Sequence, residues 1–451
     1  MKKKVLLICP HEAIEVFAAS KIRVAIPLVP YISLGSLAGS LLRDGVDAHI
    51  LDLSVYDNPD AVLERALRDF SPDFVGITFT TALASAADEV ARKVRAMHPS
   101  AVLIAGGVHA TTLPEDVLKN TVFDIVCIGE GEETIREIAA GKSPRDILGI
   151  GYKEDGEIKI NPRRPLIEDL DDLPLPAWHL YDLKKYSTPR INARKNPVGA
   201  METSRGCVFG CIFCNKTVFQ RRFRAKSPER VVDEMEYMLK CGFREIHLWD
   251  DGFSTDLNRA KEICRLILRR GLEFPWNIYN GLRVDRLDEE LLRLLKSAGC
   301  YRISIGVESG NQEVLNDVDK NITPEQIRRA AKMIKTAGIE SLGFFLVGFP
   351  KDTESSMRET IDFAKELNLD LPKVGIIMPL PGTPLFDRWQ SEGRILSYEW
   401  SKYIFHADKS SVYRHPSLPY ETIRNYYDKF YRELYFSPKF IWKRFIRGLK
   451  T

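Results

Sequence analysis

The sequence has little of several features that would assign it to a class at once. It has 8 cysteines in 451 residues, far too few for a secreted protein held together by disulfides. The 65 Lys and Arg residues nearly balance the 62 Asp and Glu residues, and the net charge of +3 removes the main argument for a nucleic-acid partner. The apolar run after Lys4 is only about five residues long, shorter than a secretory or membrane-spanning segment. We therefore expect a cytoplasmic protein.

Hydrophobic residues make up 44% of the chain, enough for large cores, and the length suggests two to three domains. Within residues 1–140, short apolar runs alternate with amphipathic stretches, which predicts a parallel sheet covered by helices on both faces, a Rossmann-like doubly wound α/β domain. Ligands of such sheets bind beyond the carboxyl ends of the strands. The expected strands are Val5–Cys9, Ala48–Leu53, Phe74–Phe79, Val102–Ala105 and Ile125–Ile128.

The rest of the chain divides into three further parts. Residues 141–196 are rich in proline and predict a linker, with a small hairpin at 151–160. Residues 197–385 predict a partial (βα)6 barrel, with functional loops after the strands. Residues 386–451 are aromatic and basic and predict a small α-helical region. The expected barrel strands are Val198–Thr203, Glu245–Trp249, Trp276–Tyr279, Arg302–Val307, Leu342–Val347 and Val374–Met378.

Three cysteines are spaced Cys-x3-Cys-x2-Cys directly after the first strand of this barrel: Cys207, Cys211 and Cys214. Thiolates are the natural ligands of iron–sulfur clusters, and three of them leave one iron open to bind a reacting molecule. A zinc site would need a fourth ligand, and the spacing of His247, the next histidine along the chain, does not suggest one. For the five scattered cysteines we expect buried structural thiols.

The segment Glu202–Cys214 resembles the cluster motif of the radical S-adenosylmethionine (SAM) enzymes. Further segments resemble later family motifs in order, at Trp249–Phe253, Ile305–Gly310, Gly348–Pro350 and Pro379–Pro384. The resemblance covers residues 195–390 and implies a 4Fe-4S cluster and bound SAM. The expected SAM-binding residues are Asp250, Asp251, Arg283, Glu308 and Pro379. Adjacent side chains leaving a strand point to opposite faces, so we expect only one of the two aspartates, Asp251, to touch SAM.

Small and hydroxyl residues follow three neighbouring strands of the first domain, where a large flat ligand could approach the backbone. These segments, ahead of a radical SAM barrel, resemble the cobalamin-binding domain of cobalamin-dependent radical SAM enzymes. The Asp-x-His-x-x-Gly motif that displaces the lower cobalt ligand in many cobalamin proteins is not met at Cys9–Ile14, so we expect no histidine on cobalt and interpret His109 as a pocket or hydrogen-bonding residue. The implied cobalamin-binding residues are Thr78, Thr80, Gly106, Gly107, His109, Gly129 and Glu130.

The combined resemblance implies a methyltransferase acting on an unactivated carbon. A 5′-deoxyadenosyl radical would remove a hydrogen atom from the substrate, and the carbon radical would take a methyl group from methylcobalamin. A cyclisation or rearrangement with the same cofactors stays open, as does a non-catalytic iron–sulfur and cobalamin sensor. A methylthiotransferase would call for an amino-terminal cysteine triad, which this chain does not have. The residue that positions or deprotonates the substrate is not identified.

The expected partners are a small-molecule or lipid-like substrate and an external electron donor of the flavodoxin or ferredoxin type. The segment Lys439–Lys450 alternates basic with apolar residues in a helical pattern. Two interpretations stay open for it: a helix packed on the barrel, or a peripheral contact with an anionic membrane surface.

Overall fold

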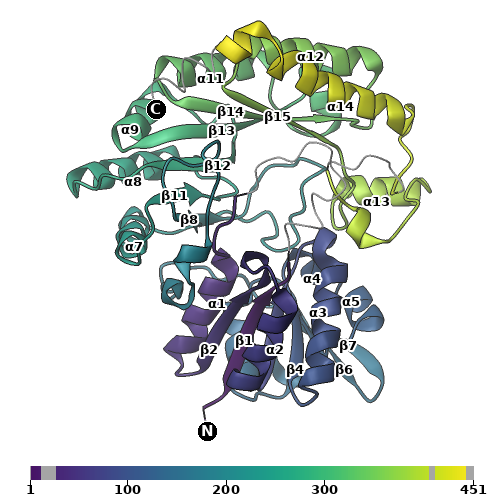
Figure 1. Ribbon diagram of the computed structural model, residues 1–451. Helices are drawn as coiled ribbons and strands as arrows, with labels where there is room; N and C mark the ends of the chain where they lie inside the picture. Colours follow the sequence, from purple (N-terminus) through teal and green to yellow (C-terminus); the bar gives the residue numbers. More distant parts are fainter. Residues whose placement is uncertain (1, 12–26, 406–411, 443–451) are drawn as a thin grey trace.

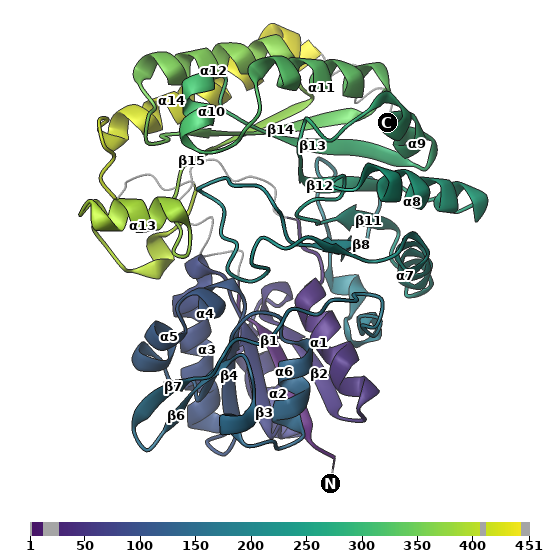
Figure 2. The same cartoon turned by 180° about the vertical axis from the view of Figure 1, so that it is seen from behind.

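The computed structural model describes residues 2–11, 27–405 and 412–442. Two α/β parts are stacked on each other, with the amino-terminal part in purple and blue below and the second part in teal and green above (Figures 1 and 2). Each part has its own parallel sheet with helices packed against it (Figure 1). The predicted pair of α/β domains is confirmed.

The first sheet has seven strands in the order β2-β1-β3-β4-β5-β6-β7. Its first five strands in the chain are parallel, and their order changes direction at β1, so the topological switch lies between β1 and β3. Such a switch point leaves a crevice at the carboxyl ends of the strands. The strand bounds are β1 Lys4–Cys9, β2 Asp47–Asp52, β3 Phe74–Thr78, β4 Val102–Gly106, β5 Ile125–Cys127, β6 Ile150–Glu154 and β7 Glu157–Ile160.

Helices cover both faces of this sheet because alternate side chains of its strands feed two separate cores. On β1, Val5 and Leu7 belong to one core, whereas Leu6 and Ile8 belong to the other. The first core includes side chains of α1 and α6, and the second those of α2, α3 and α5. The helices are α1 Ile32–Arg43, α2 Pro59–Phe70, α3 Ala84–Met97, α4 Val108–Thr112, α5 Pro114–Asn120 and α6 Glu132–Ala139.

The predicted hairpin β6–β7 is present, but it is not part of a linker. It pairs antiparallel with β5, so Ile125 lies opposite Tyr152, and the first sheet continues beyond residue 140. Its turn places Asp155 and Gly156 in the left-handed region, with φ of 52° and 82°, as a tight hairpin requires. The short strand β5 would otherwise present an open sheet edge, which the hairpin covers.

The second sheet has six parallel strands in the order β15-β14-β13-β12-β11-β8, as expected for a partial barrel. A short antiparallel ribbon, β9 Ser204–Arg205 with β10 Arg224–Ala225, follows the first strand. The strands of this sheet are β8 Val198–Met201, β11 Glu245–Leu248, β12 Trp276–Leu282, β13 Cys300–Glu308, β14 Glu340–Val347 and β15 Leu371–Ile376. The helices of the barrel are α7 Pro228–Lys240, α8 Leu257–Arg269, α9 Glu289–Ser297, α10 Gln312–Asp317, α11 Pro324–Thr336 and α12 Glu354–Leu367.

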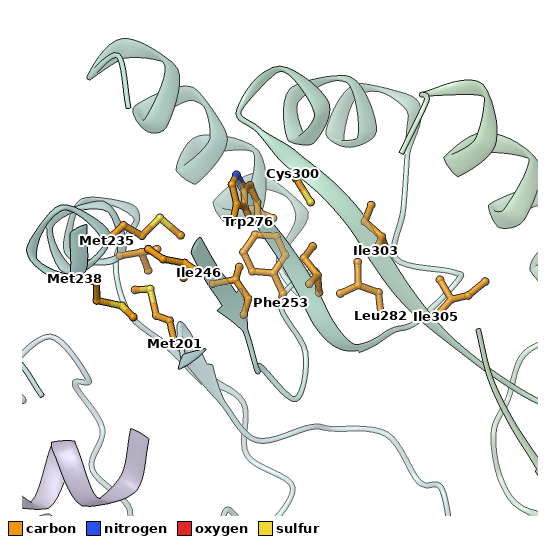
Figure 3. Close-up of a cluster of buried hydrophobic side chains, with 14 of the residues drawn as sticks. Met201, Met235, Met238, Ile246, Phe253, Trp276, Leu282, Cys300, Ile303 and Ile305 are labelled. Atoms are coloured by element: carbon orange, nitrogen blue, oxygen red, sulfur yellow. The ribbon is translucent and has the colours of Figure 1, made fainter. Parts of the chain in front are cut away.

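The outer face of the barrel packs on its helices through a continuous apolar core. Figure 3 shows Met235 and Met238 of α7 lying against Met201 and Ile246 of the strands, with Trp276 further along. Because side chains alternate along a strand, the remaining positions, such as His247 and Asn277, face the inside of the barrel. Many of these inward residues are polar, so the barrel has an apolar outer face and a largely polar interior.

The carboxy-terminal region adds α13 Pro384–Ser391 and α14 Tyr420–Tyr435, as predicted. Helix α14 packs beside β15 and α12 (Figure 1), and the Tyr435 hydroxyl donates to the Pro372 carbonyl at 2.7 Å. Among the described helices, none is both long and apolar enough to cross a membrane. Most of the predicted amphipathic helix falls at 443–451, outside the described residues, so both interpretations of that tail stay predictions.

Candidate functional site

A cavity of about 660 Å³ lies between the carboxyl ends of the first sheet and the barrel. Its lining combines residues that are far apart in the sequence but belong to the two facing strand edges. From the first domain these include Gly76, Thr78, Thr80, Gly106, Gly107, Gly129 and Glu130, and from the barrel side Glu202, Arg205, Phe219, Trp249 and Tyr279. The cavity therefore lies between the predicted cobalamin edge and the barrel, and neither the three predicted cluster cysteines nor the predicted SAM-binding residues are part of its lining.

The glycines of this cavity leave the backbone open to a large ligand. A Cβ atom built at Gly106 would meet only the Ile77 carbonyl, at 3.9 Å, so its position faces free space. Gly107 and Gly129 have φ of 95° and 92°, a region that favours glycine. A flat macrocycle such as cobalamin could lie against this edge, and six of the seven predicted cobalamin-binding residues line the cavity.

His109 is the exception, because it does not line the cavity. Its Nδ1 lies 3.2 Å from the Thr81 hydroxyl, and its ring packs edge-on against Trp400 of the carboxy-terminal region. Burial lowers the pKa of His109 to about 4, so the ring is neutral. Of the two roles expected for His109, the structure shows the hydrogen bond, and the histidine is not among the residues that line the cavity, although it comes only two residues after Gly107.

The three predicted cluster cysteines lie on one loop between β9 and β10, and all three are free thiols. Distant parts of the chain hold this loop. The Ile212 amide donates to the Val318 carbonyl at 3.1 Å, and the Ile212 carbonyl accepts from the Leu385 amide at 3.0 Å. The Asn215 amide donates to the Pro381 carbonyl at 2.8 Å and to the Thr112 hydroxyl at 3.0 Å. The loop is fixed by both domains.

Among the described residues, no three His, Cys, Asp or Glu side chains are grouped around a common point as ligands of one metal ion. A cubane cluster does not need such a grouping, because each thiolate binds a different iron. The three thiols lie on a loop that contains no helix, and cysteine thiolates are the usual ligands of iron–sulfur clusters. The loop also packs tightly, since a side chain at Gly210 would collide with the Asp319 carboxylate. Cys207, Cys211 and Cys214 thus fit the predicted cluster chemically.

The two neighbouring aspartates after β11 have different roles. Asp250 is buried, and its carboxylate accepts the Thr203 amide at 2.6 Å and the Ser204 hydroxyl at 2.8 Å. It therefore holds the strand end before the cysteines, and the expectation that only Asp251 of the two touches SAM stays a prediction. Asp251 accepts the Gly206 amide at 3.1 Å, and burial together with the charge of Glu202 raises its pKa to about 6.

Glu308 is the last residue of β13, and its φ is 64°. Its carboxylate accepts a hydrogen bond from the Lys320 ammonium at 2.7 Å. Burial by itself would lower the pKa of Lys320, but Glu308 and the nearby Cys211 thiol more than offset that effect and raise it. Lys320 is thus a buried cation beside the cysteine loop. Sequence reasoning missed it, because it lies in an irregular loop 12 residues after Glu308, where no periodicity or motif marks it.

Arg283 does not present a free guanidinium to a ligand. It donates to the Lys320 carbonyl at 2.8 Å and the Asn321 carbonyl at 3.1 Å, pairs with Asp285 at 2.9 Å, and stacks 3.7 Å from the centre of the Phe209 ring. Arg283 therefore holds the loop that carries Lys320, and its predicted contact with SAM stays a prediction. Pro379 is buried just beyond β15.

A buried ion-pair network joins the two domains under the cavity. Arg205, two residues before the first cysteine, pairs with Glu130 at 2.7 Å, Glu132 at 2.6 Å and Glu202 at 2.7 Å. Arg224 of β10 also pairs with Glu130, at 2.8 Å. The sequence shows these charges next to the motif glycines and cysteines, but only the fold shows that they meet. Glu130 therefore has a structural partner in addition to its place in the cavity wall.

Family models match most of the described chain. Residues 201–364 match the model of the radical SAM superfamily, and residues 27–139 match that of the B12 binding domain. Residues 383–451 match a domain of unknown function, DUF4070.

Curated relatives are similar over nearly the whole length. The uncharacterized methyltransferase PH0819 of Pyrococcus horikoshii is 34% identical over 438 residues, covering 93% of each chain. The cytidylyl-2-hydroxyethylphosphonate methyltransferase of Streptomyces wedmorensis is 30% identical over 85% of this chain and 81% of its own. The anaerobic magnesium-protoporphyrin IX monomethyl ester cyclase of Rubrivivax gelatinosus is also 30% identical, over 82% of this chain and 67% of its own.

Among solved structures, the radical SAM methyltransferase TsrM from Kitasatospora setae, solved with cobalamin and a [4Fe-4S] cluster, superposes with a TM-score of 0.72 at 21% identity. The match covers 87% of this chain and 75% of that one. At this level of identity the likeness concerns the fold: a doubly wound domain stacked on a partial barrel.

Proposed function

The chain belongs to the radical SAM enzymes that carry an amino-terminal cobalamin-binding domain, and we propose that it transfers a methyl group to an unactivated carbon of a small molecule. The observation that carries this proposal is the single cavity of about 660 Å³ lined by both strand edges. A carbon radical and a methyl donor must meet within one chamber for this reaction, and shared confinement supplies the required proximity.

When bound, the 4Fe-4S cluster, SAM and cobalamin supply the radical and the methyl group. In our proposal Cys207, Cys211 and Cys214 hold the cluster, and the loop between β9 and β10 offers no fourth cysteine, so one iron stays open for SAM. Asp250 fixes the strand end before these cysteines through Thr203. The chain's own contribution at this end is a rigid loop.

The proposed SAM pocket lies between the cysteine loop and the end of β13. The Lys320 ammonium is suited to the SAM carboxylate, and the Glu308 carboxylate to the ribose hydroxyls, since both are charge-assisted hydrogen bonds. Asp251 beside Gly206 is suited to the SAM amino group. Arg283 acts through the Lys320 loop and is a positioning residue in this scheme.

The proposed cobalamin surface is the edge formed by Thr78, Thr80, Gly106, Gly107 and Gly129. We propose no histidine ligand of cobalt from this chain, because the Asp-x-His-x-x-Gly motif is not met after β1. The apolar residues Phe79, Phe219 and Trp249 complete the wall and exclude water from the chamber.

A second candidate keeps the cofactors and changes the outcome to a cyclisation, since the Rubrivivax gelatinosus relative bears a cyclase name at 30% identity. In either case we propose an external electron donor of the flavodoxin or ferredoxin type. Both candidates share the first half of the reaction, so they separate only at the product, where methyl transfer adds the mass of one methylene group.

The test is anaerobic reconstitution of the full chain with iron, sulfide and hydroxocobalamin, followed by metal and sulfide analysis and paramagnetic resonance. We expect a 4Fe-4S cluster, bound cobalamin, and 5′-deoxyadenosine formed from SAM after reduction. Cys211→Ala should lose the cluster signal, whereas Cys241→Ala, a matched change outside the loop, should retain it. A cluster without any affinity for cobalamin would contradict the proposal.

A further inference from the structure

The inside of the barrel contains polar atoms that the proposed cofactor chemistry does not use. The Nδ1 of His247, the Nε1 of Trp249 and the Oγ of Ser304 are buried, and none of the three has a hydrogen-bond partner among the described residues. Buried polar groups without partners are rare in native proteins and destabilising, so three of them in one barrel interior point to a ligand.

The Oδ1 of Asn277, which also faces the inside of the barrel, is a fourth buried atom without a partner among the described residues, whereas other polar groups nearby are satisfied. The Glu245 carboxylate accepts hydrogen bonds from His247 Nε2 at 2.7 Å and from the Tyr301 hydroxyl at 2.6 Å. Arg302 forms an ion pair with Glu340. Because a carboxylate only accepts hydrogen bonds, Nε2 of His247 carries the proton and Nδ1 is an acceptor. The unused set therefore comprises two acceptors, His247 Nδ1 and Asn277 Oδ1, together with the Trp249 N–H donor and the Ser304 hydroxyl.

A lysine without a counterion completes this set. Lys373 comes from β15, and its Nζ lies 5.8 Å from the centre of the Tyr279 ring. Within the part of the chain that the structure describes, its ammonium has no carboxylate and no hydrogen-bond acceptor within bonding distance. Burial and the like charge of Arg302 lower the pKa of Lys373 to about 8. A partly buried ammonium next to another cation favours an anion beside it.

The position of Lys373 connects it with the proposed reaction chamber. The Tyr279 ring stacks on Trp249 and on His247, with 5.6 Å between ring centres in both pairs, and both Tyr279 and Trp249 line the cavity. Across the sheet, Lys373 pairs with Phe344, which pairs with Gly306, two residues before Glu308. The lysine is therefore close to the aromatic wall of the cavity and level with the end of β13 that carries Glu308, although it is not itself part of the cavity lining.

We propose that Lys373 binds an oxyanion of the substrate, a carboxylate or phosphate-type group, inside the barrel. The substrate is then a small acidic molecule whose remaining part packs on Tyr279 and Trp249 and faces the cobalamin edge. Charge-assisted hydrogen bonds from the ammonium anchor the anion, and the Ser304 hydroxyl and Trp249 N–H supply further donors. This assignment deepens the proposed function and rests on it for the identity of the chamber.

The test measures the accessibility of Lys373 in the reconstituted full chain by competitive acetylation and peptide mass spectrometry. The probes are benzoate and phenylphosphonate, with benzamide as the neutral counterpart, each with and without SAM. With each anion present at about ten times its Kd, we expect acetylation of Lys373 to slow about tenfold, because only about a tenth of the lysine then stays unprotected. Benzamide should have no effect, and Lys332, exposed on α11, serves as the internal reference.

Variants separate an anion site from a structural role. In calorimetry, Lys373→Met should weaken phenylphosphonate binding about tenfold, whereas Lys373→Arg should retain most of it and Lys332→Met all of it. Equal acetylation rates with and without the anions would overturn the inference. Full protection by SAM alone would also overturn it, because the lysine would then serve the SAM carboxylate.

These outcomes are distinguishable from a failure of the proposed function. Loss of the cluster or of cobalamin binding, with anion protection of Lys373 intact, would contradict the methyltransferase proposal and leave the oxyanion site standing. Full cofactor loading and SAM cleavage without anion protection would overturn the oxyanion site alone.

Discussion

Arg205 and Glu130 form a buried ion pair of 2.7 Å across the interface of the two domains, with 8% and 4% of their side chains exposed. The arginine precedes the cysteine loop, and the glutamate follows β5 at the cavity edge. The two cofactor sites are therefore fixed relative to each other by a direct electrostatic contact.

Arg205→Met should lower the free energy of unfolding by about 3–5 kcal/mol, because it leaves Glu130 and Glu132 partly uncompensated in a buried site. Arg222→Met is the matched control. Arg222 pairs with Glu168, and because 55% of the arginine side chain and 65% of the glutamate side chain are exposed, this pair contributes at most about 1 kcal/mol to the free energy of unfolding. Urea unfolding monitored by circular dichroism measures both. Equal effects of the two changes would show that the interdomain pair does not contribute as described.

Lys320→Met should weaken SAM binding about tenfold in the reconstituted protein, because the proposed carboxylate contact is lost. The same change leaves Glu308 as an unpaired buried acid, so the double variant Lys320→Met with Glu308→Gln is needed. The double variant should recover stability but not SAM affinity, measured by equilibrium dialysis. Recovery of affinity along with stability would assign Lys320 a purely structural role.

Gly106→Val should reduce cobalamin affinity about tenfold or more, which corresponds to about 1.4 kcal/mol. The added side chain meets only one protein atom, at 3.9 Å from its Cβ, and otherwise projects into the cavity. The unfolding of the cofactor-free protein should therefore stay the same, which serves as the control. Cobalamin binding is followed by its visible absorption, and unchanged affinity would mean that cobalamin does not lie on this edge.

Asp352→Asn should reduce the dependence of stability on pH between about 4 and 6. Burial raises the pKa of Asp352 to about 6 from an ordinary value of 3.8, so the folded state binds a proton that the unfolded state releases in this window. The wild-type chain therefore loses stability as pH rises through it, by about 2–3 kcal/mol from this group.

The Asp352 carboxylate accepts hydrogen bonds from the Gly348 amide at 2.8 Å and the Phe349 amide at 2.9 Å. An asparagine side chain keeps an oxygen that can accept both of these hydrogen bonds, but it does not ionise. The difference in unfolding free energy between wild type and variant, measured at both ends of the window, isolates this group from others that titrate. A difference that does not change with pH would refute the assignment.

Much of the fold follows from local pattern. Apolar runs predict the parallel strands of the first sheet to within a few residues, because most of those strands are buried on both faces. The barrel strands are predictable from their apolar outer positions, although their inward positions include polar residues such as His247 and Asn277. The hairpin β6–β7 was predicted from Asp155 and Gly156 but assigned to a linker, since strand pairing across a sheet edge is a tertiary contact that the turn does not encode.

The site was predictable where chemistry and spacing coincide, as for the cysteine loop and the glycines at the strand ends. It was not predictable where a side chain's role depends on its partner. Asp250 and Arg283 looked like ligand contacts in the sequence, yet their hydrogen-bonding groups are used by Thr203 and by the Lys320 loop. Lys320 and Lys373 carried no motif, and only folding brings them to the barrel interior.

The cysteine loop is held by Thr112 on one side and by Val318, Pro381 and Leu385 on the other. These supports are produced at widely separated times during synthesis, the last of them about 170 residues after the final cysteine, and domains generally form in order along the chain. A nascent chain would therefore expose its three thiols before the residues that enclose them have been made. During that interval the three exposed thiols are open to oxidation.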